Sequence, residues 1–377
     1  MATSPLRIGI VGAGSSGVYL AHLLSRFNVD VSLFERSSYP RAEGCGILLV
    51  SSGMEALFKG DARLCSAIVD SGAIARTYEF RNMRDRLVNT HVAEYEGDEQ
   101  PSVLVHRGKI LNALLDRLDP NCLQTNAKLV STTQTDADIT ARFADGSTWT
   151  GDVLVGADGI FSTVREAVIP NVRPRYLGDV VWRGIVPDTD FCREGNFIVY
   201  MRSRGVYANF FDLGGGYTHW GFFIEKEQTG DDRDRSTPLD VSMPAEELAK
   251  IPDAPRSIIE STNPADIKCR FSYDLDMLPC IRNGRIILIG DAAHAKSPTR
   301  ARGMTSGLED ALSLSRYIAE STPDAIQQSL ADFQSERLPI NHEYQRSSRE
   351  ISRKVGRRRP LPGSAMAIKT AIARSME

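Results

Sequence analysis

The N-terminal residues alternate between short apolar runs and a glycine-rich turn. Residues 7–11 (RIGIV) are a β-branched run typical of a buried strand, and residues 18–27 (VYLAHLLSRF) carry apolar positions at helical spacing. The turn GAGSSG lies between them, and a second strand-like run, VSLFE, follows the helix and ends in Glu35. This order predicts a strand–turn–helix–strand unit of the α/β class.

Two later apolar runs have the composition of strands buried on both faces. Residues 152–156 (DVLVG) come shortly before Asp158, and residues 285–290 (RIILIG) come directly before Asp291. A helical start follows each of them. We therefore expect both aspartates at the carboxyl ends of parallel strands, where open α/β sheets bind their ligands.

Between about residues 179 and 272 the pattern changes to alternating apolar and polar positions, which predicts antiparallel strands. The strand-like runs are VVWRGIV, NFIVYMR, VYANFFDL and YTHWGFFIE, and residues 77–94 are expected to add strands to the same sheet. Period-2 alternation predicts that Tyr207, Asn209 and Phe211 share one face. It also puts Trp220 and Phe222 together on one face. Pocket lining and packing against helices both remain open for these aromatic residues, and we expect His219 to be exposed or satisfied rather than a base.

Length and composition narrow the class of protein. The 377 residues suit about two domains, and 42% hydrophobic with 25% charged residues is ordinary for a globular protein. A net charge of −3 does not favour nucleic acid as a partner. The six cysteines are scattered without metal-ligand spacing, so we expect reduced, mostly buried thiols and no metal site. The first apolar stretch is not typical of a signal peptide or membrane span, so we expect a cytoplasmic protein without stable membrane insertion.

The GAGSSG turn has the glycine spacing of a dinucleotide site. Gly12 permits the tight turn, Gly14 lets the backbone approach a pyrophosphate, and Gly17 lets helix and strand pack closely. The N-terminus of the helix offers free N–H groups to phosphate, and Glu35 can accept hydrogen bonds from ribose hydroxyls. This motif alone does not separate FAD from NAD.

Three motifs in order resemble those of the class A flavoprotein monooxygenases, the para-hydroxybenzoate hydroxylase and salicylate hydroxylase superfamily, which also holds tetracycline-inactivating enzymes. They are GAGSSG with Glu35, ADGIFSTVR at 157–165, and GDAAH at 290–294 with Pro298 and Gly303. The arginine-led helix VHRGKILNALLDRL and the loop YPRAEGCGILL add two further matches. The resemblance covers roughly residues 5–340.

The resemblance implies an α/β fold with a Rossmann-like FAD-binding domain of the glutathione-reductase type, an inserted β-sheet substrate domain and a C-terminal helix. The FAD-binding domain would comprise residues 1–76, 106–178 and 273–338. Residues 77–105 and 179–272 would form the substrate domain, and residues 339–377 the C-terminal segment, whose stretch 346–359 is basic. That basic stretch fits a solvated helical face with a mobile tail, with an acidic partner or a membrane surface as the alternative.

The resemblance also implies a set of site residues. Those expected to bind the cofactor are Gly12, Gly14, Ser16, Gly17, Glu35, Arg36, Arg41, Arg107, Asp158, Gly290, Asp291, Pro298, Arg302, Gly303 and Met304. Those expected near the substrate are Trp182, Arg183, Asn209, Phe211, Trp220 and Phe222. No residue stands out as a catalytic base. For Arg107 and Arg165 the alternative role is an ion pair on a helix surface. For Asp158 and Asp291 the alternative is a turn or a helix N-cap.

The function implied is that of an FAD-dependent monooxygenase that consumes NADH or NADPH and inserts one oxygen atom of O₂ into a small organic substrate through a flavin C4a-hydroperoxide. Hydroxylation is favoured, and epoxidation or Baeyer–Villiger-type oxidation stays open. A monomer or homodimer is expected. The main alternative is a geranylgeranyl-reductase-like flavoenzyme. A flavin halogenase fits less well, because Gly184 replaces the second tryptophan of that signature in WRGIVP and Lys59 is the only lysine in the stretch where the halogenase lysine would fall.

The loop PTRARGM departs from the family pattern Pro-x-x-Gly-Gln-Gly, since Ala301 and Arg302 stand where glycine and glutamine are usual. Because a Cβ penalises positive φ, we expect a negative φ at Ala301 or a different loop path. We hypothesise that Arg302 or Arg300 stabilises the anionic edge of the flavin or grips an anionic substrate. The alternative is an arginine that points from the loop into solvent.

Overall fold

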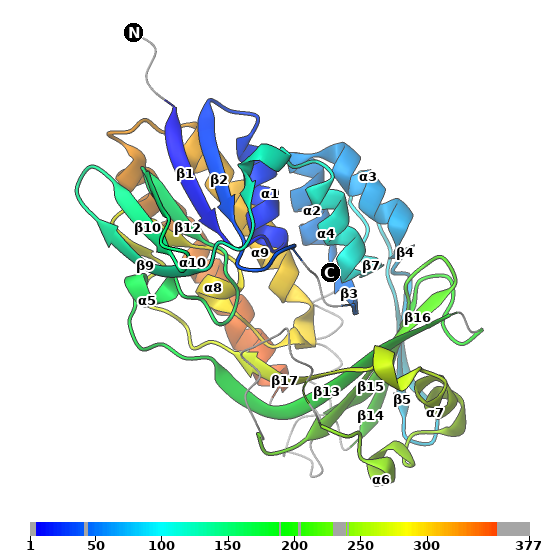
Figure 1. The fold of residues 1–377 in the computed structure, drawn as a ribbon. Coiled ribbons are helices and arrows are strands. Elements are labelled where there is room, and N and C mark those ends of the chain that lie inside the picture. Colours follow the sequence, from blue (N-terminus) through cyan, green and yellow to red (C-terminus); the bar gives the residue numbers. More distant parts are fainter. Residues whose placement is uncertain are drawn as a thin grey trace.

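Five parallel strands from distant parts of the described chain form the central layer of the computed structural model. The structure describes residues 5–40, 44–187, 190–202, 205–228, 239 and 241–352. Arg41 and the basic residues beyond 352 lie outside the described residues. The six-stranded sheet has the order β18-β19-β12-β1-β2-β8, in which only the edge pair β18–β19 is antiparallel (Figure 1). Its strands are β1 (Leu6–Val11), β2 (Val29–Phe34), β8 (Leu123–Gln124), β12 (Val153–Gly156), β18 (Arg282–Asn283) and β19 (Ile286–Leu288).

Both faces of this sheet are covered, which is why its central strands are apolar throughout. Helices α1 and α9 pack together behind β1, and a three-stranded antiparallel sheet covers the other face, where Gly9 leaves room for the Trp149 ring. The helices in the part of the molecule that contains the parallel sheet are α1 (Ser15–Leu24), α2 (Ser51–Gly60), α3 (Ala62–Ser71), α4 (Arg107–Leu115), α5 (Arg165–Val168), α8 (Asp291–His294), α9 (Arg302–Ala319) and α10 (Ile326–Ser352). The small sheets are β11-β10-β9 and β3-β7-β4, with β3 (Gly46–Leu49), β4 (Ala73–Ile74), β7 (Val103–His106), β9 (Leu129–Gln134), β10 (Ile139–Phe143) and β11 (Thr148–Gly151).

A seven-stranded sheet, β17-β13-β16-β15-β14-β5-β6, lies below the parallel sheet in Figure 1. The strands expected from residues 77–94 do join it, as the edge pair β5–β6. Helices α6 (Ala245–Leu248) and α7 (Asp253–Glu260) lie on the side of this sheet away from the parallel sheet. The strands are β5 (Thr77–Asn82), β6 (Leu87–Val92), β13 (Arg175–Pro187), β14 (Asn196–Arg202), β15 (Gly205–Asp212), β16 (Tyr217–Glu225) and β17 (Lys268–Asp274). The predicted α/β class with an added β-sheet and a C-terminal helix is confirmed, whereas the exact domain boundaries stay a prediction.

Tyr207 does not share a face with Asn209 and Phe211, so the period-2 prediction is wrong at that residue. The β14–β15 register pairs Tyr200 with Ala208 and Met201 with Val206, which leaves Tyr207 as an extra residue. Such a β-bulge turns one side chain to the opposite face. The Tyr207 ring consequently packs against Phe222 in the core behind the sheet, with ring centroids 5.2 Å apart.

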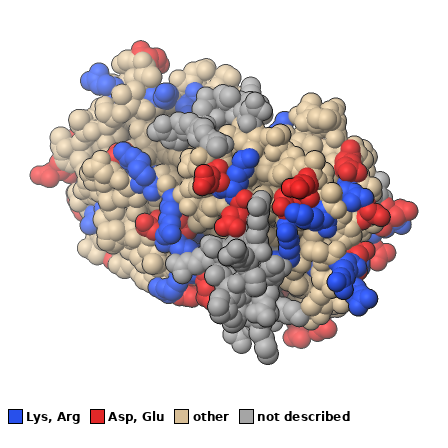
Figure 2. Space-filling view, turned by 90° about the horizontal axis from the view of Figure 1, so that it is seen from below, with Lys and Arg blue, Asp and Glu red and all other residues tan. Residues whose placement is uncertain are grey.

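The long C-terminal helix α10 begins at Ile326 and continues through Pro339 to Ser352. Four of the six cysteines are buried, in line with the expectation that most of them are. Within the described residues, no helix is long and apolar enough to cross a membrane. Acidic and basic side chains lie side by side over the described part of the face shown in Figure 2.

The WRGIVP segment supplies a stability prediction. A Cβ built on Gly184 would lie 2.6 Å from the Trp220 indole nitrogen, which itself donates to Thr262 Oγ1 at 2.8 Å. We therefore expect Gly184→Ala to lower the free energy of unfolding by about 1–3 kcal/mol through overpacking. Urea unfolding followed by tryptophan fluorescence measures the change. An unchanged midpoint would contradict this packing.

Candidate active site

A cavity of about 430 Å³ lies between the carboxyl edge of the parallel sheet and one face of the seven-stranded sheet. The turn before α1 lines one end with Gly14 and Ser16, and the 295–304 loop lines a second wall. Strands β13, β15 and β16 supply the floor. Segments that are far apart in the sequence thus meet at the edge where α/β sheets bind ligands, as the sequence predicted.

The glycine turn has the geometry that a pyrophosphate requires. Gly12 has φ of 106°, and a Cβ on Gly17 would collide with the Gly12 carbonyl oxygen, so both positions need glycine for the turn itself. A Cβ on Gly14 would meet no protein atom within 4 Å, so the space beside its backbone is free for a ligand. Glu35 closes the turn by accepting hydrogen bonds from the backbone N–H groups of Ala13 and Ser37. Arg36 is exposed and does not line the cavity.

Asp158 acts as a cap within its own loop and does not line the cavity. Its two carboxylate oxygens accept hydrogen bonds from Ser162 Oγ and from the backbone N–H groups of Thr163 and Val164. Burial raises the pKa of this carboxyl. Arg165, in the same segment, donates to the carbonyl oxygens of Ile160 and Ala292. This arginine ties the Asp-Gly loop to α8, and it is not a surface ion pair.

The Gly-Asp loop is held by a buried network that reaches three helices. Gly290 has φ of 59° at the start of α8, and its N–H donates to Asp310 Oδ2 of α9 at 3.0 Å. His294 Nε2 lies 2.5 Å from the same oxygen. On the other carboxylate oxygen, Arg337 and Asn341 of α10 donate at 2.9 and 3.1 Å. Asp291 lines the cavity at the mouth of this loop.

Lys296 belongs to this network and also lines the cavity. Its ammonium group lies 2.9 Å from His294 Nδ1, 2.7 Å from Ser306 Oγ and 3.4 Å from Asn341 Oδ1, which matches its three N–H donors. Burial lowers the pKa of Lys296 from 10.5 to about 8. No motif pointed to this residue, because a lone lysine two positions after GDAAH carries no periodic or spacing signal.

The PTRARGM loop keeps a left-handed backbone despite its alanine. Ala301 has φ of 53° and ψ of 21°, so the expected negative φ is wrong. An L-residue in this region costs roughly 1–2 kcal/mol, which the packed loop must offset. The Arg302 guanidinium donates to Ser52 Oγ at 2.7 Å and lies 4.9 Å from the centre of the Tyr344 ring, away from the cavity. Arg300, Pro298, Gly303 and Met304 do line the cavity.

The residues expected near the substrate divide between the two faces of the sheet. Arg183, Asn209 and Phe211 line the cavity, together with Phe223. Trp182, Trp220 and Phe222 do not line it, and are buried in the core behind the sheet, since alternation turns even and odd positions of β13 and β16 to opposite faces. The Trp182 indole N–H donates to the Val241 carbonyl oxygen at 2.8 Å.

His219 is satisfied, as expected, but it is buried in the cavity wall. Its Nδ1 accepts a hydrogen bond from the Gly46 N–H at 3.0 Å, and its ring lies 4.5 Å from the Phe211 ring. Burial, followed by the nearby charges of Arg183 and His106, holds the pKa of His219 well below its ordinary value. The imidazole is therefore neutral with its proton on Nε2, which leaves that N–H as a donor.

Further polar residues in the cavity wall were missed by sequence reasoning because they come from β-strands without a motif. Ser272 Oγ donates to Asp179 Oδ2 at 2.5 Å, and Arg270 lies beside them on β17. Arg107, at the start of α4, is exposed and lines the cavity, and its contact with the flavin stays a prediction.

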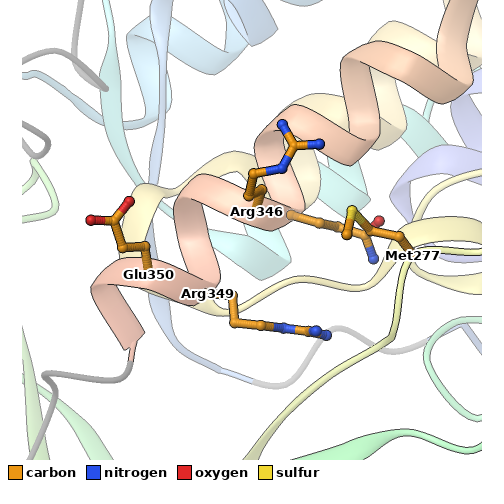
Figure 3. A pocket seen from close by; sticks show the side chains of 5 residues that line it. Met277, Arg346, Arg349 and Glu350 are labelled. Carbon is orange, nitrogen blue, oxygen red and sulfur yellow. The ribbon is translucent and has the colours of Figure 1, made fainter.

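A second hollow, of about 290 Å³, lies against α10 near Met277 (Figure 3). Arg349 in its wall donates to Asp274, Asp276 and the Leu275 carbonyl oxygen. Its guanidinium thus fastens α10 to the end of β17, which is a structural role.

The comparisons with known proteins agree with this geometry. Residues 6–348 match the family described as FAD binding domain. The chain belongs to the FAD binding domain family. This enzyme is 27% identical over 362 residues to the 3-amino-4-hydroxybenzoate 2-monooxygenase of Streptomyces cremeus, covering 93% of this chain and 88% of that protein. It is 29% identical over 404 residues to the salicylate hydroxylase of Pseudomonas putida, covering 95% and 88%.

The fold is shared with solved structures of flavoproteins. HpxO of Klebsiella pneumoniae complexed with FAD and uric acid superposes with a TM-score of 0.81 at 18% identity, covering 98% of this chain and 92% of that one. A salicylate hydroxylase substrate complex gives a TM-score of 0.77 at 24% identity, covering 98% and 93%. The tetracycline destructase Tet(55) superposes with a TM-score of 0.74 at 17% identity, covering 100% of this chain and 97% of that one. The resemblance to class A flavoprotein monooxygenases is confirmed. The enzyme is an FAD-dependent monooxygenase, with NAD(P)H as its reductant.

The free space at Gly14 and the tight contact at Gly17 predict different effects of two alanine variants on stability. Gly14→Ala should leave the free energy of unfolding of the apoprotein within about 0.5 kcal/mol, because the Cβ meets no protein atom. It should weaken FAD binding about tenfold or more, since the methyl group occupies the side open to the pyrophosphate. Gly17→Ala should lower stability as well as FAD affinity. Urea unfolding and titration by flavin fluorescence separate the two cases; FAD binding by Gly14→Ala at wild-type strength would contradict the assignment.

Asp310 predicts a pH dependence of stability. Burial alone would raise the pKa of Asp310, but His294, Arg337 and the Gly290 N–H hold it far below its ordinary value of 3.8. The folded state therefore releases this proton more readily than the unfolded state, so the stabilisation is present above about pH 4 and is lost as the pH falls. In urea unfolding, the stability of the wild type should decline more steeply than that of Asp310→Asn between about pH 5 and pH 3. At pH 7 the variant should be less stable by about 3–5 kcal/mol. If the free energy of unfolding of the two proteins changed equally with pH, the role given to Asp310 would be refuted.

Proposed function

We propose that the enzyme hydroxylates a small aromatic compound that binds against the cavity face of the seven-stranded sheet. The observation that carries the proposal is the continuity of one cavity, with the glycine turn and the 295–304 loop at one side and Phe211, Phe223 and His219 at the other. Relatives named for hydroxylation of aminohydroxybenzoate and salicylate support an aromatic substrate.

The residues on the nucleotide side fit FAD. Gly12, Gly14 and Gly17 with the N-terminus of α1 would hold the pyrophosphate, and Glu35 retains lone pairs for ribose hydroxyls beyond its two backbone bonds. Asp291, Pro298, Gly303 and Met304 would line the flavin part of the cavity. Among the two loop arginines, Arg300 is the better candidate for the anionic edge of the flavin, because it lines the cavity and its Nε is buried without a hydrogen-bond partner.

Bound FAD would supply the chemistry that activates O₂, with NADH or NADPH as its reductant. The chain itself must orient the ring and keep water away. Phe211 and Phe223 provide apolar contact area in the cavity wall. The Phe211 ring stacks on the Phe197 ring, with the ring centroids 4.9 Å apart and an angle of 9° between the ring planes. The neutral His219 would donate from Nε2 to a ring hydroxyl of the substrate, which orients the phenol.

An electron-rich ring favours hydroxylation over epoxidation or Baeyer–Villiger-type oxidation, and the cavity contains aromatic side chains suited to such a ring.

We also propose a cytoplasmic enzyme that acts as a monomer or homodimer. A role as a reductase of the same fold would require turnover without oxygen incorporation, which gives a direct experimental distinction.

The test is the fate of O₂ with the purified yellow protein, NADH or NADPH, and a panel of hydroxybenzoates and aminohydroxybenzoates. We expect substrate-stimulated oxidation of the nicotinamide, O₂ uptake in equal amount, and a product heavier by one oxygen atom in mass spectrometry. With ¹⁸O₂ the product should carry the label. Flavin reduction without an oxygenated product from the whole panel would overturn the proposal.

A further inference from the structure

We propose that Lys296 takes up a proton when the bound flavin is reduced, and that this residue thereby makes the reduction potential of the enzyme depend on pH. The inference goes beyond the proposed function, because it concerns the enzyme with its cofactor alone and holds for any substrate. It gives a role to a buried amine that the hydroxylation proposed above does not use.

Lys296 lies in the cavity wall, beside the N-terminal end of α9. The residue belongs to the 295–304 loop, and only 7% of its surface is exposed. Its Nζ is 2.7 Å from Ser306 Oγ of α9, and Gly303 and Met304 at the start of that helix line the same cavity. The N-terminus of a helix carries partial positive charge. The ammonium group and the helix therefore add positive potential to the same wall.

The charge of Lys296 is not held by an ion pair. Its three N–H groups are directed at neutral acceptors, which are His294 Nδ1 at 2.9 Å, Ser306 Oγ, and Asn341 Oδ1 at 3.4 Å. The nearby carboxylate of Asp310 is paired with His294 and Arg337 instead. A buried ammonium group without a carboxylate partner changes its protonation state readily, because burial disfavours the charged form.

Charged and titratable groups face Lys296 from three helices. They are Asp291 and His294 of α8, Arg302, Glu309 and Asp310 of α9, and Arg337 and Tyr344 of α10. Arg337 donates to both Asp310 and Glu309, so these two acids share one cation. Burial is the strongest influence on Lys296, and it lowers the pKa of the amine from 10.5 to about 8. A change of charge in the cavity can therefore shift its protonation near neutral pH.

Reduction of the flavin is such a change of charge. Hydride transfer from NADH or NADPH adds two electrons and one proton to FAD, so the bound cofactor gains one negative charge. That charge stabilises the ammonium form of Lys296 and raises the pKa of the amine in the reduced enzyme. An amine that is neutral in the oxidised enzyme then takes one proton from solvent. The cavity thus gains one positive charge for the one negative charge.

The sign of the effect defines three ranges of pH. Below about pH 8 the amine is charged in both states, so reduction takes up only the proton that goes to the flavin. Above that pH a second proton goes to Lys296. At a pH above the pKa of the amine in the reduced enzyme, Lys296 is neutral in both states, and its stabilisation of the reduced flavin is lost.

The experiment measures the reduction potential of the FAD-loaded wild type between about pH 7 and pH 9.5, by anaerobic spectroelectrochemistry and without substrate. With one proton per two electrons, the equilibrium constant for reduction falls about tenfold per pH unit, which is about 30 mV. With two protons it falls about a hundredfold, which is about 60 mV. We expect the slope to change from the first value to the second above about pH 8. A single slope over the whole range overturns the proposal.

Two variants assign the second proton to Lys296. Lys296→Met removes the charge, so at pH 7 it should lower the equilibrium constant for reduction about tenfold, or about 30 mV. It should keep the shallow slope throughout, and its potential should approach that of the wild type as the pH rises. Lys296→Arg keeps the charge at every pH, so it should keep the potential of the wild type at pH 7 and lose the steep range.

Lys109→Met is the matched control. Lys109 is exposed on α4, donates to the Ser71 carbonyl oxygen, and does not line the cavity. This control should reproduce the pH profile of the wild type. All proteins would be measured at FAD concentrations above their dissociation constants, so that a variant with weakened FAD binding still gives a potential.

The outcomes separate a change of charge at Lys296 from a structural effect. A steep range in the wild type and in Lys109→Met that is absent from the Lys296 variants supports the proposal. A steep range that persists in Lys296→Met or in Lys296→Arg assigns the proton to another group and overturns it. If one Lys296 variant does not fold, the slope of the other decides. None of these measurements contains a substrate, so their failure leaves aromatic hydroxylation standing.

Discussion

The buried carboxylate of Asp310 is the interaction on which the nucleotide side of the cavity depends. It receives hydrogen bonds from the backbone of Gly290, from His294, and from Arg337 and Asn341, so it connects α8, α9 and α10 at one point. An unpaired charge at such a depth would be costly, which makes the full set of partners necessary. The loop that begins at Gly290 consequently leaves the parallel sheet in one direction, with Lys296 and Arg300 in the cavity wall.

The second constraint is the two-faced character of the seven-stranded sheet. One face carries the core of Trp182, Trp220 and Phe222, and the other carries the cavity wall with Arg183, Asn209 and His219. Each polar cavity residue therefore alternates with a large apolar residue that anchors its strand. Such an arrangement holds the cavity-facing side chains on a rigid support, which is what oxygen transfer to one particular carbon of a substrate demands.

The cations in and near the cavity are not equivalent. Arg302 is the residue most conspicuous in the sequence, yet its guanidinium contacts Ser52 and Tyr344 and helps fix α9 against α2 and α10. Lys296 is committed to three acceptors in the buried network. Arg183 and Arg300 retain hydrogen-bonding capacity toward the cavity. An anionic group in the cavity would therefore interact with the cations that remain unpaired, and the total number of cations matters less.

The sequence by itself determined the parallel unit, its glycine turn, the two strand-end aspartates and the membership in a flavoprotein family, because these are local signals of spacing and periodicity. It also located most strands of the second sheet, with a miss at Tyr207, where an added residue shifts the alternation. Only the tertiary structure decided which face of β13 and β16 lines the cavity. It also showed that His219 and Lys296 lie in the cavity wall and that Ala301 is left-handed. The physical reason is that burial, pairing of charges and backbone strain are set by neighbours from distant segments, and a pattern along one strand does not say which neighbours it will have.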